Sequence, residues 1–213
     1  YFPISTDLTL TAGTTYALDG QVYVLPGATL TIEPGVEIRS FGGGSLAIAR
    51  GAMIHAEGTA GAPITFTSDQ DDGTWRQTAN EWGNLTILGD AYISENATPG
   101  NVATPSASNF ADMEGLTPPA AFLSARQYGG GNDDDNSGTV AFCTFRYGGR
   151  VVGLDNELNG LSIGGVGRGT DMHPVEVMNS VGDGIEVWGG ALSRKDFSIW
   201  NVGDDSLDLD QGW

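Results

Sequence analysis

Several features common in protein chains are scarce in this sequence of 213 residues. It contains a single cysteine, Cys143, so no disulfide bond can form within the chain. No apolar run approaches the roughly 20 residues of a membrane span. The first residues also lack the basic and apolar regions of a signal peptide, so we expect any such peptide to have been removed. We predict no membrane insertion.

Positive charge is scarce as well. Lys195 is the only lysine, and 9 Lys and Arg residues stand against 27 Asp and Glu residues, for a formal net charge of −18. A chain this acidic has no electrostatic reason to bind DNA, RNA or an anionic lipid surface. The charge suits cations, neutral glycans or a soluble exported surface. We therefore expect an extracellular or cell-surface location, with a neutral glycan or neighbouring copies of the chain as partners.

Helical periodicity is nearly absent, and short alternating segments such as QVYV, TLTI, VEVM and FSIW take its place. These segments read as short strands closed by Gly, Pro, Asn or Asp. Val24 and Ile48 stand 24 residues apart, whereas Val175 and Phe197 stand 22 apart. A unit of this length with three short strands is one turn of a parallel β-helix, and crossovers between parallel strands are right-handed. We predict an all-β, right-handed parallel β-helix.

The repeat also predicts how the chain is organised. Residues 1–20 are expected to cap the first coil, 21–89 to form coils, 90–138 to leave the repeat as a loop excursion, and 139–213 to form further coils. An excursion of this length inside a compact domain is usually functional or disordered. Within it, TPPAAFLSARQY suggests a short helix. SLDLDQGW is still in the repeat where the sequence stops, so we expect an uncapped or truncated end that could stack on another copy into a fibre.

Carboxylates follow the 22-residue repeat near the C-terminus, where Asp183 corresponds to Asp205 and Glu186 to Asp208. Equivalent side chains on stacked strands lie about 4.8 Å apart. Two negative charges at that distance repel by about 3 kcal/mol at an effective dielectric constant near 20. We expect Glu186 and Asp208 to point outward, where solvation weakens this repulsion. If the side chains converge instead, one is protonated or a cation lies among them.

Three interpretations of these carboxylates stay open. They form a solvated ladder, a Ca²⁺ site built from Asp183, Glu186, Asp205 and Asp208, or a catalytic cluster; Ca²⁺ takes about six to eight oxygen ligands. The segment NSVGDGIEV…NVGDDSLDL resembles the polygalacturonase family of β-helix glycoside hydrolases. That resemblance implies Asp183, Asp204 and Asp205 as the inverting acid and base. The family's later Gly-His-Gly and Arg-x-Lys turns have no counterpart after Asp205.

A wider resemblance covers nearly the whole chain. The segments GATLTIEPG, WGNLTILGDA, YGGGNDDDNSGTVAFCTFRYGG and GDDSLDLDQGW together resemble a family of secreted or surface-anchored bacterial β-helix proteins with a pectin-lyase-like fold. The resemblance implies export and membership of a larger surface protein, without a defined activity. We accordingly predict a structural or adhesive extracellular module, stabilised by Ca²⁺; the alternative is a carbohydrate-active hydrolase that uses the clustered Asp residues.

Tryptophan side chains could form a sugar-stacking face if they are exposed. Among Trp75, Trp82, Trp188, Trp200 and Trp213, we select Trp188 as the ligand-binding candidate, because it follows the inward-facing Val187.

Two further segments have the composition of Ca²⁺-binding loops, SDQDDG at 68–73 and GNDDDNSG at 131–138. Neither carries the terminal Glu of the twelve-residue Ca²⁺ loop, so we interpret both as acidic turns. Cys143 alternates with Phe142 and Phe145, a pattern that predicts a packed side chain instead of a nucleophile.

Overall fold

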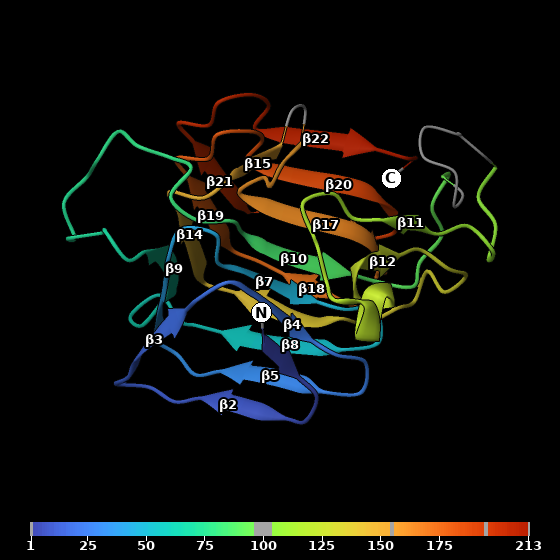
Figure 1. The fold of residues 1–213 in the computed structure, drawn as a ribbon, viewed down its shortest axis with the longest axis horizontal. Helices are drawn as coiled ribbons and strands as arrows, with labels where there is room; N and C mark the ends of the chain where they lie inside the picture. The colour runs from blue at the N-terminus through green and yellow to red at the C-terminus, as the bar shows by residue number, and fades with distance from the viewer. Residues whose placement is uncertain (1, 96–103, 154–155, 194–195, 213) are drawn as a thin grey trace.

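The computed structural model describes residues 2–95, 104–153, 156–193 and 196–212, and strands dominate the regular structure of these ranges. Within each of the three main sheets, neighbouring strands pair in parallel and come from successive coils. Figure 1 shows these coils stacked from the blue N-terminal strands to β22 in red. The parallel β-helix that the repeat predicts is confirmed.

The chain winds through three sheets, which we call A, B and C. Sheet A contains, in spatial order, β1 (Phe2–Ile4), β4 (Gln21–Val24), β7 (Ser45–Ile48), β10 (Leu85–Leu88), β17 (Leu161–Val166), β20 (Ile185–Gly190) and β22 (Leu207–Asp210). Sheet B contains β2 (Leu8–Leu10), β5 (Thr29–Ile32), β8 (Met53–Glu57), β13 (Gly138–Ala141) and β18 (Asp171–Met172). Sheet C contains β3 (Thr15–Leu18), β6 (Glu37–Ser40), β9 (Ile64–Ser68), β14 (Cys143–Arg146), β19 (Val175–Met178) and β21 (Phe197–Trp200).

The register of the sheets follows the sequence repeat. Val24 pairs with Ile48, and Val175 pairs with Phe197, as the 24-residue and 22-residue spacings predict. Residues 8–18, expected to belong to a cap, form β2 and β3, which pair in parallel with β5 and β6 as a layer of the stack. In the described part of the chain, the coil after β20 contributes strands to sheets C and A.

The space between the three sheets is filled by the inward-facing side chains of every coil. Phe66 on β9 stacks on Phe145 on β14, with ring centroids 4.8 Å apart, because the two residues are partners in the parallel register. The ring centroid of Trp82 lies 6.5 Å from that of Phe66, and Trp82 is completely buried. Cys143 is also buried in this core, and burial raises the pKa of its thiol to about 12. The thiol is therefore protonated and packed, as its alternation with two phenylalanines predicts.

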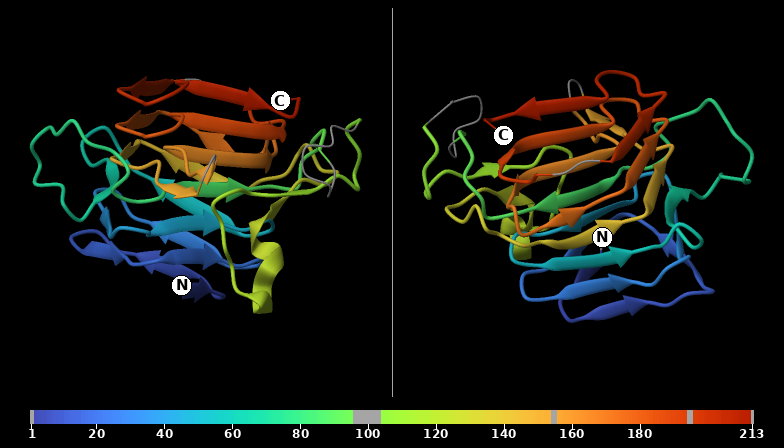
Figure 2. Two further views of the ribbon diagram at one scale, coloured as in Figure 1. Left: turned by 45° about the horizontal axis from the view of Figure 1, so that its top comes forward. Right: turned by 180° about the vertical axis from the view of Figure 1, so that it is seen from behind.

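Segments outside the three sheets leave the stack at two corners (Figure 1, Figure 2). Residues 69–84 form a loop between sheets C and A, and residues 89–95 and 104–137 belong to the excursion between sheets A and B. The excursion contains β11 (Ala111–Asp112), which pairs antiparallel with β12 (Gln127–Tyr128), and the 3₁₀ segment η1 (Ala120–Arg126). A hairpin of β15 (Val151–Gly153) and β16 (Asn156–Glu157) leaves at the same corner as the loop.

The described helical structure is limited to η1, and it offers no helix of the length and hydropathy needed to cross a membrane.

Candidate acidic site on sheet A

The outer face of sheet A is covered by the excursion. A second apolar cluster lies between them, in which Tyr23 and Trp188 of the sheet join Met113 and Tyr128 of the excursion. At Gly164 of β17, a Cβ atom would lie 2.6 Å from the Tyr128 ring, so the excursion can approach the sheet this closely only over a glycine. The excursion therefore buries a face that the strand alternation would otherwise leave in water.

Trp188 is a member of this second cluster and is only 8% exposed. The prediction that it stacks on a ligand is wrong, because the excursion already occupies the face that the indole would present. Trp82 is buried in the main core, whereas Trp75 and Trp200 are 56% and 38% exposed. Trp213 lies outside the described residues.

Beside the apolar cluster, one outward column of sheet A is polar along four strands. Parallel pairing places Thr86 against Ser162, Ser162 against Glu186, and Glu186 against Asp208. Thr86 and Ser162 are 0% and 1% exposed, and Asn84 connects them by accepting from the Thr86 hydroxyl (3.0 Å) and donating to Ser162 Oγ (2.7 Å). The column thus begins as a satisfied polar network and ends at two carboxylates.

The turns from sheet C to sheet A bring further carboxylates to this end of the column. Asp183 lies just before β20 and is 9% exposed, and its Oδ1 accepts the backbone N–H of Asp205 at 2.9 Å. The amide of Asn159 links turn and strand, since its Oδ1 accepts the Asp183 N–H at 2.9 Å and its Nδ2 donates to Glu186 Oε2. Asp204 and Asp205, in the next turn, are exposed.

The predicted metal ligands converge in two overlapping groups. One oxygen each from Asp183, Glu186 and Asp208 lie within 4.8 Å of one another, and the same holds for Asp183, Asp204 and Asp205. The structure therefore brings the four predicted Ca²⁺ ligands to one place, with Asp183 shared between the groups. We call Asp183, Glu186, Asp204, Asp205 and Asp208 the acidic site.

Convergence changes the protonation of the site. Burial, followed by the charges of Glu114, Asp183 and Asp208, raises the pKa of Glu186 to about 8, against a smaller opposing effect of the Asn159 hydrogen bond. Burial also raises the pKa of Asp183, with the backbone N–H of Asp205 working in the opposite direction. Full solvation of the outward carboxylates is thus wrong for Glu186, because the excursion excludes water from part of this face.

Glu114 comes from the excursion, and sequence reasoning missed it. Partial desolvation of its carboxyl group, followed by the charges of Glu157 and Asp183, raises its pKa, although the residue as a whole is exposed and water moderates the effect. No repeat spacing relates Glu114 to Glu186, so no pattern in the sequence could have joined them. Asn159 was missed as well, although it stands 24 residues before Asp183, the same spacing that pairs Leu161 with Ile185, so the repeat could have found it.

Basic side chains are not paired with the acidic site in the part of the chain that the structure describes: no ion pair there joins one to these carboxylates. The two histidines lie at sheet B, His55 near Glu57 and His173 near Asp171. A polygalacturonase-like site would need a basic partner, and neither histidine supplies one.

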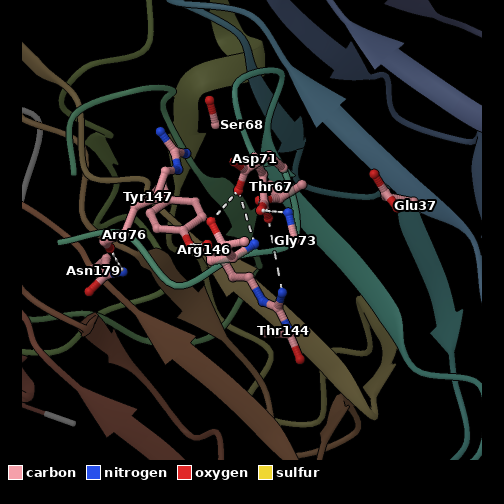
Figure 3. A network of polar contacts seen from close by, with 12 residues as sticks. Glu37, Thr67, Ser68, Asp71, Gly73, Arg76, Thr144, Arg146, Tyr147 and Asn179 are labelled. Carbon is pink, nitrogen blue, oxygen red and sulfur yellow. Dashed lines mark hydrogen bonds and ion pairs between the residues drawn. The ribbon is translucent and has the colours of Figure 1, made fainter. Parts of the chain in front are cut away.

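The other acidic segments are satisfied within the protein. Asp133 and Asp134 form ion pairs with Arg168 at 3.6 and 2.8 Å. Asp71 is 6% exposed and accepts from the Thr67 hydroxyl at 2.6 Å and the Gly73 N–H at 2.9 Å (Figure 3). These contacts agree with acidic turns.

Figure 3 also shows how the loop of residues 69–84 is held against the coils. Arg76 lies over the Tyr147 ring, 4.5 Å from its centroid, and its guanidinium donates to both carboxylate oxygens of Glu81 at 2.8 and 2.9 Å. Asn179 donates to the Arg76 carbonyl at 3.0 Å, and its side-chain oxygen accepts from Asn201 one coil later. The loop therefore fixes the corner from which Asp183 projects.

The sequence of residues 3–213 matches the family described as a pectate-lyase-like β-helix domain. The match spans nearly the whole chain, and the protein belongs to this family. The resemblance to pectin-lyase-like β-helix proteins is thus confirmed. Neither the curated proteins nor the solved structures gave a match. The family defines the fold, and the function has to be argued from the site.

Proposed function

We propose that the protein is an extracellular structural or adhesive module whose acidic site binds Ca²⁺. The observation that carries this proposal is the convergence of Asp183, Glu186 and Asp208 without a basic partner in the described part of the chain. Five carboxylates in one place leave a negative charge that protonation of Glu186 offsets only in part.

The donor set fits Ca²⁺. This ion takes about six to eight oxygens at roughly 2.3–2.6 Å, so two ligands on opposite sides of it lie about 5 Å apart. Oxygens that all lie within 4.8 Å of one another can therefore share one ion. An all-oxygen set of carboxylates suits Ca²⁺ better than Zn²⁺, which prefers nitrogen and sulfur.

Such an ion would stiffen the module. Asp183 belongs to one turn, Asp205 to the turn of the next coil, and Glu186 and Asp208 to adjacent strands of sheet A. A cation shared among them would join two coils, and it would relieve the repulsion that acts on Glu186. A rigid stack of coils is suited to presenting a surface, either to a neutral glycan or to neighbouring copies of the chain.

Thermal unfolding with EDTA and with millimolar Ca²⁺ tests this proposal. At about 100 times the dissociation constant, Ca²⁺ should stabilise the wild type by about 3 kcal/mol, which corresponds to a rise in Tm of roughly 5–10 °C. The double variant Asp183→Asn with Asp205→Asn should lose this rise. Asp133→Asn with Asp134→Asn removes the same charge from the turn paired with Arg168 and should keep it. An unchanged Tm in the wild type would contradict Ca²⁺ binding.

A carbohydrate hydrolase is the second candidate, and the raised pKa of Glu186 favours it. A carboxylic acid protonated near neutral pH beside ionised carboxylates is the arrangement of a general acid and its partner. The inverting mechanism needs roughly 6.5–9.5 Å between carboxyl groups, whereas oxygens of Asp183, Asp204 and Asp205 lie within 4.8 Å. The spacing therefore speaks against these three residues as an inverting pair. A polysaccharide-cleavage screen with wild type and Glu186→Gln decides: turnover that the variant loses would replace the structural proposal.

A further inference from the structure

A second site lies away from sheet A, at the corner where sheet B passes to sheet C. A pocket of about 220 Å³ opens there across four successive coils. Its walls include Pro63, Phe142 and Pro174, and its polar side chains include Thr144, Glu176 and Asp196. None of the lining residues in the described part of the chain is basic. We propose that this pocket binds an amino sugar, with the ring on Phe142 and the ammonium group at Glu176 and Asp196.

Phe142 is the first reason for this assignment. It turns the chain from β13 to β14 in one residue with a left-handed φ of 50°, a conformation that bulky side chains rarely adopt. The turn is fixed by hydrogen bonds along the corner, from Phe142 N–H to the Pro174 carbonyl at 2.8 Å and from Ile64 N–H to the Phe142 carbonyl at 3.0 Å. Gly or Asn would fit this backbone better, yet the position carries an aromatic ring that is 38% exposed. A strained backbone that holds an exposed ring points to a use for the ring.

Glu176 is the second reason, because its carboxylate is oriented. Oε2 accepts the Thr144 hydroxyl at 3.2 Å, and Oε1 accepts the indole N–H of Trp200 at 3.4 Å. Each carboxylate oxygen can accept a further hydrogen bond, so a donor entering the pocket finds free acceptor capacity. Asp196 adds a second, exposed carboxylate from the next coil.

The ligand class follows from these walls. Prolines and an aromatic ring suit the apolar face of a sugar ring, and the volume is below that of pockets for drug-sized ligands. The two carboxylates, Glu176 and Asp196, disfavour uronates and favour a protonated amine over a hydroxyl group, since the described lining residues include no basic side chain. The pocket is separate from the acidic site, so this inference does not depend on Ca²⁺ binding.

Isothermal titration in EDTA and about 150 mM salt tests the proposal with three disaccharides: a glucosamine dimer, cellobiose and digalacturonate. The glucosamine dimer should bind about tenfold more tightly than cellobiose, because its charge-assisted hydrogen bonds are the stronger ones. Digalacturonate should give no heat of binding.

Three variants locate the binding. Phe142→Asn keeps a residue that tolerates the left-handed turn and removes the ring, and Glu176→Gln removes the oriented charge; each should weaken binding at least tenfold. Glu37→Gln is the matched control, since it removes a carboxylate from the same outward row of sheet C outside the pocket. Equal losses in all three variants, unchanged binding in the first two, no binding of any disaccharide, or equal binding of cellobiose would each overturn amino-sugar recognition here.

Discussion

Ile87 and Thr86 are neighbours on β10 and are both completely buried, but on opposite faces of sheet A. Ile87 lies in an inner column that pairs with Ile48 below and Ile163 above, so each coil repeats the same apolar contact. Thr86 lies in the outer column that leads through Ser162 to Glu186. Its burial comes from a segment that occurs once in the chain.

The two faces of sheet A are buried by different parts of the chain, and this explains why one is apolar and the other polar. A face buried by repetition has only equivalent apolar neighbours, and its energy is the transfer and packing of methyl groups. The outer face is covered by an irregular excursion, whose polar backbone and side chains must be matched one by one. At Asn84 the polar groups are hydrogen-bonded to one another, and this part of the outer face carries a neutral hydrogen-bond network. Where the excursion brings Glu114 toward Glu186, it is a site with unbalanced charge.

The largest expected change in stability comes from a substitution on the inner face of sheet A. Ile87→Ala should lower the free energy of unfolding by about 2–5 kcal/mol, because it leaves a cavity in a completely buried column. The loss should be the same with EDTA and with Ca²⁺, as measured by urea unfolding. Ile87→Val is the control, with an expected loss of about 0.5–1.5 kcal/mol. A loss that depends on Ca²⁺ would mean that the two faces are energetically coupled.

The inner face could be predicted from the sequence because two periods specify it. Alternation within a strand and the spacing of 22–24 residues between strands together place Val175 against Phe197 and Val24 against Ile48. The same periods placed Glu186 opposite Asp208 and pointed both outward. What they could predict is which residues are neighbours along the stack.

The cover of the outer face could not be predicted in this way. Glu114 reaches the acidic site through a segment without periodicity, so neither the half-burial of Glu186 nor its raised pKa has a signal in the repeat. The ligand-binding prediction for Trp188 was wrong for the same reason. Strand alternation gives the direction of its side chain but does not show which segment covers it. The strained corner at Phe142 is likewise a property of one coil, and a repeat describes only what coils share.

A second substitution, with a smaller expected effect, adds a positive charge to the acidic site. Asp133 and Asp134 already have such a countercharge in Arg168. Asp208→Lys places an ammonium group opposite Glu186 in the parallel register. In EDTA the variant should be about 1–2 kcal/mol more stable than the wild type, and added Ca²⁺ should no longer stabilise it. Asp210→Lys makes the same change of charge on the same strand, opposite Trp188, and should have less effect. Equal stabilisation by both variants would attribute the gain to net charge alone.

The smallest expected effect is the pH dependence of the metal-free protein. The pKa of Glu186 is raised to about 8 in the folded chain by burial and by Glu114, Asp183 and Asp208, whereas an unfolded glutamate titrates near its ordinary value of about 4.5. The folded state therefore holds a proton that the unfolded state has released, so the stabilisation is complete below about pH 4.5 and is lost as the pH rises through 8.

Urea unfolding in EDTA between pH 5 and pH 8 should show this loss as a decrease of about 1–2 kcal/mol in the free energy of unfolding, a range that allows for screening by water on a half-buried group. Glu186→Gln cannot titrate, and it keeps an oxygen that can accept from Asn159, so its decrease should be smaller. Ca²⁺ should reverse the slope in the wild type, because protons compete with the ion for the same oxygens. If the free energy of unfolding changed with pH equally in the wild type and in Glu186→Gln, the pH dependence would come from groups other than Glu186. The outer face of sheet A would then contribute no more to the pH dependence than the inner face.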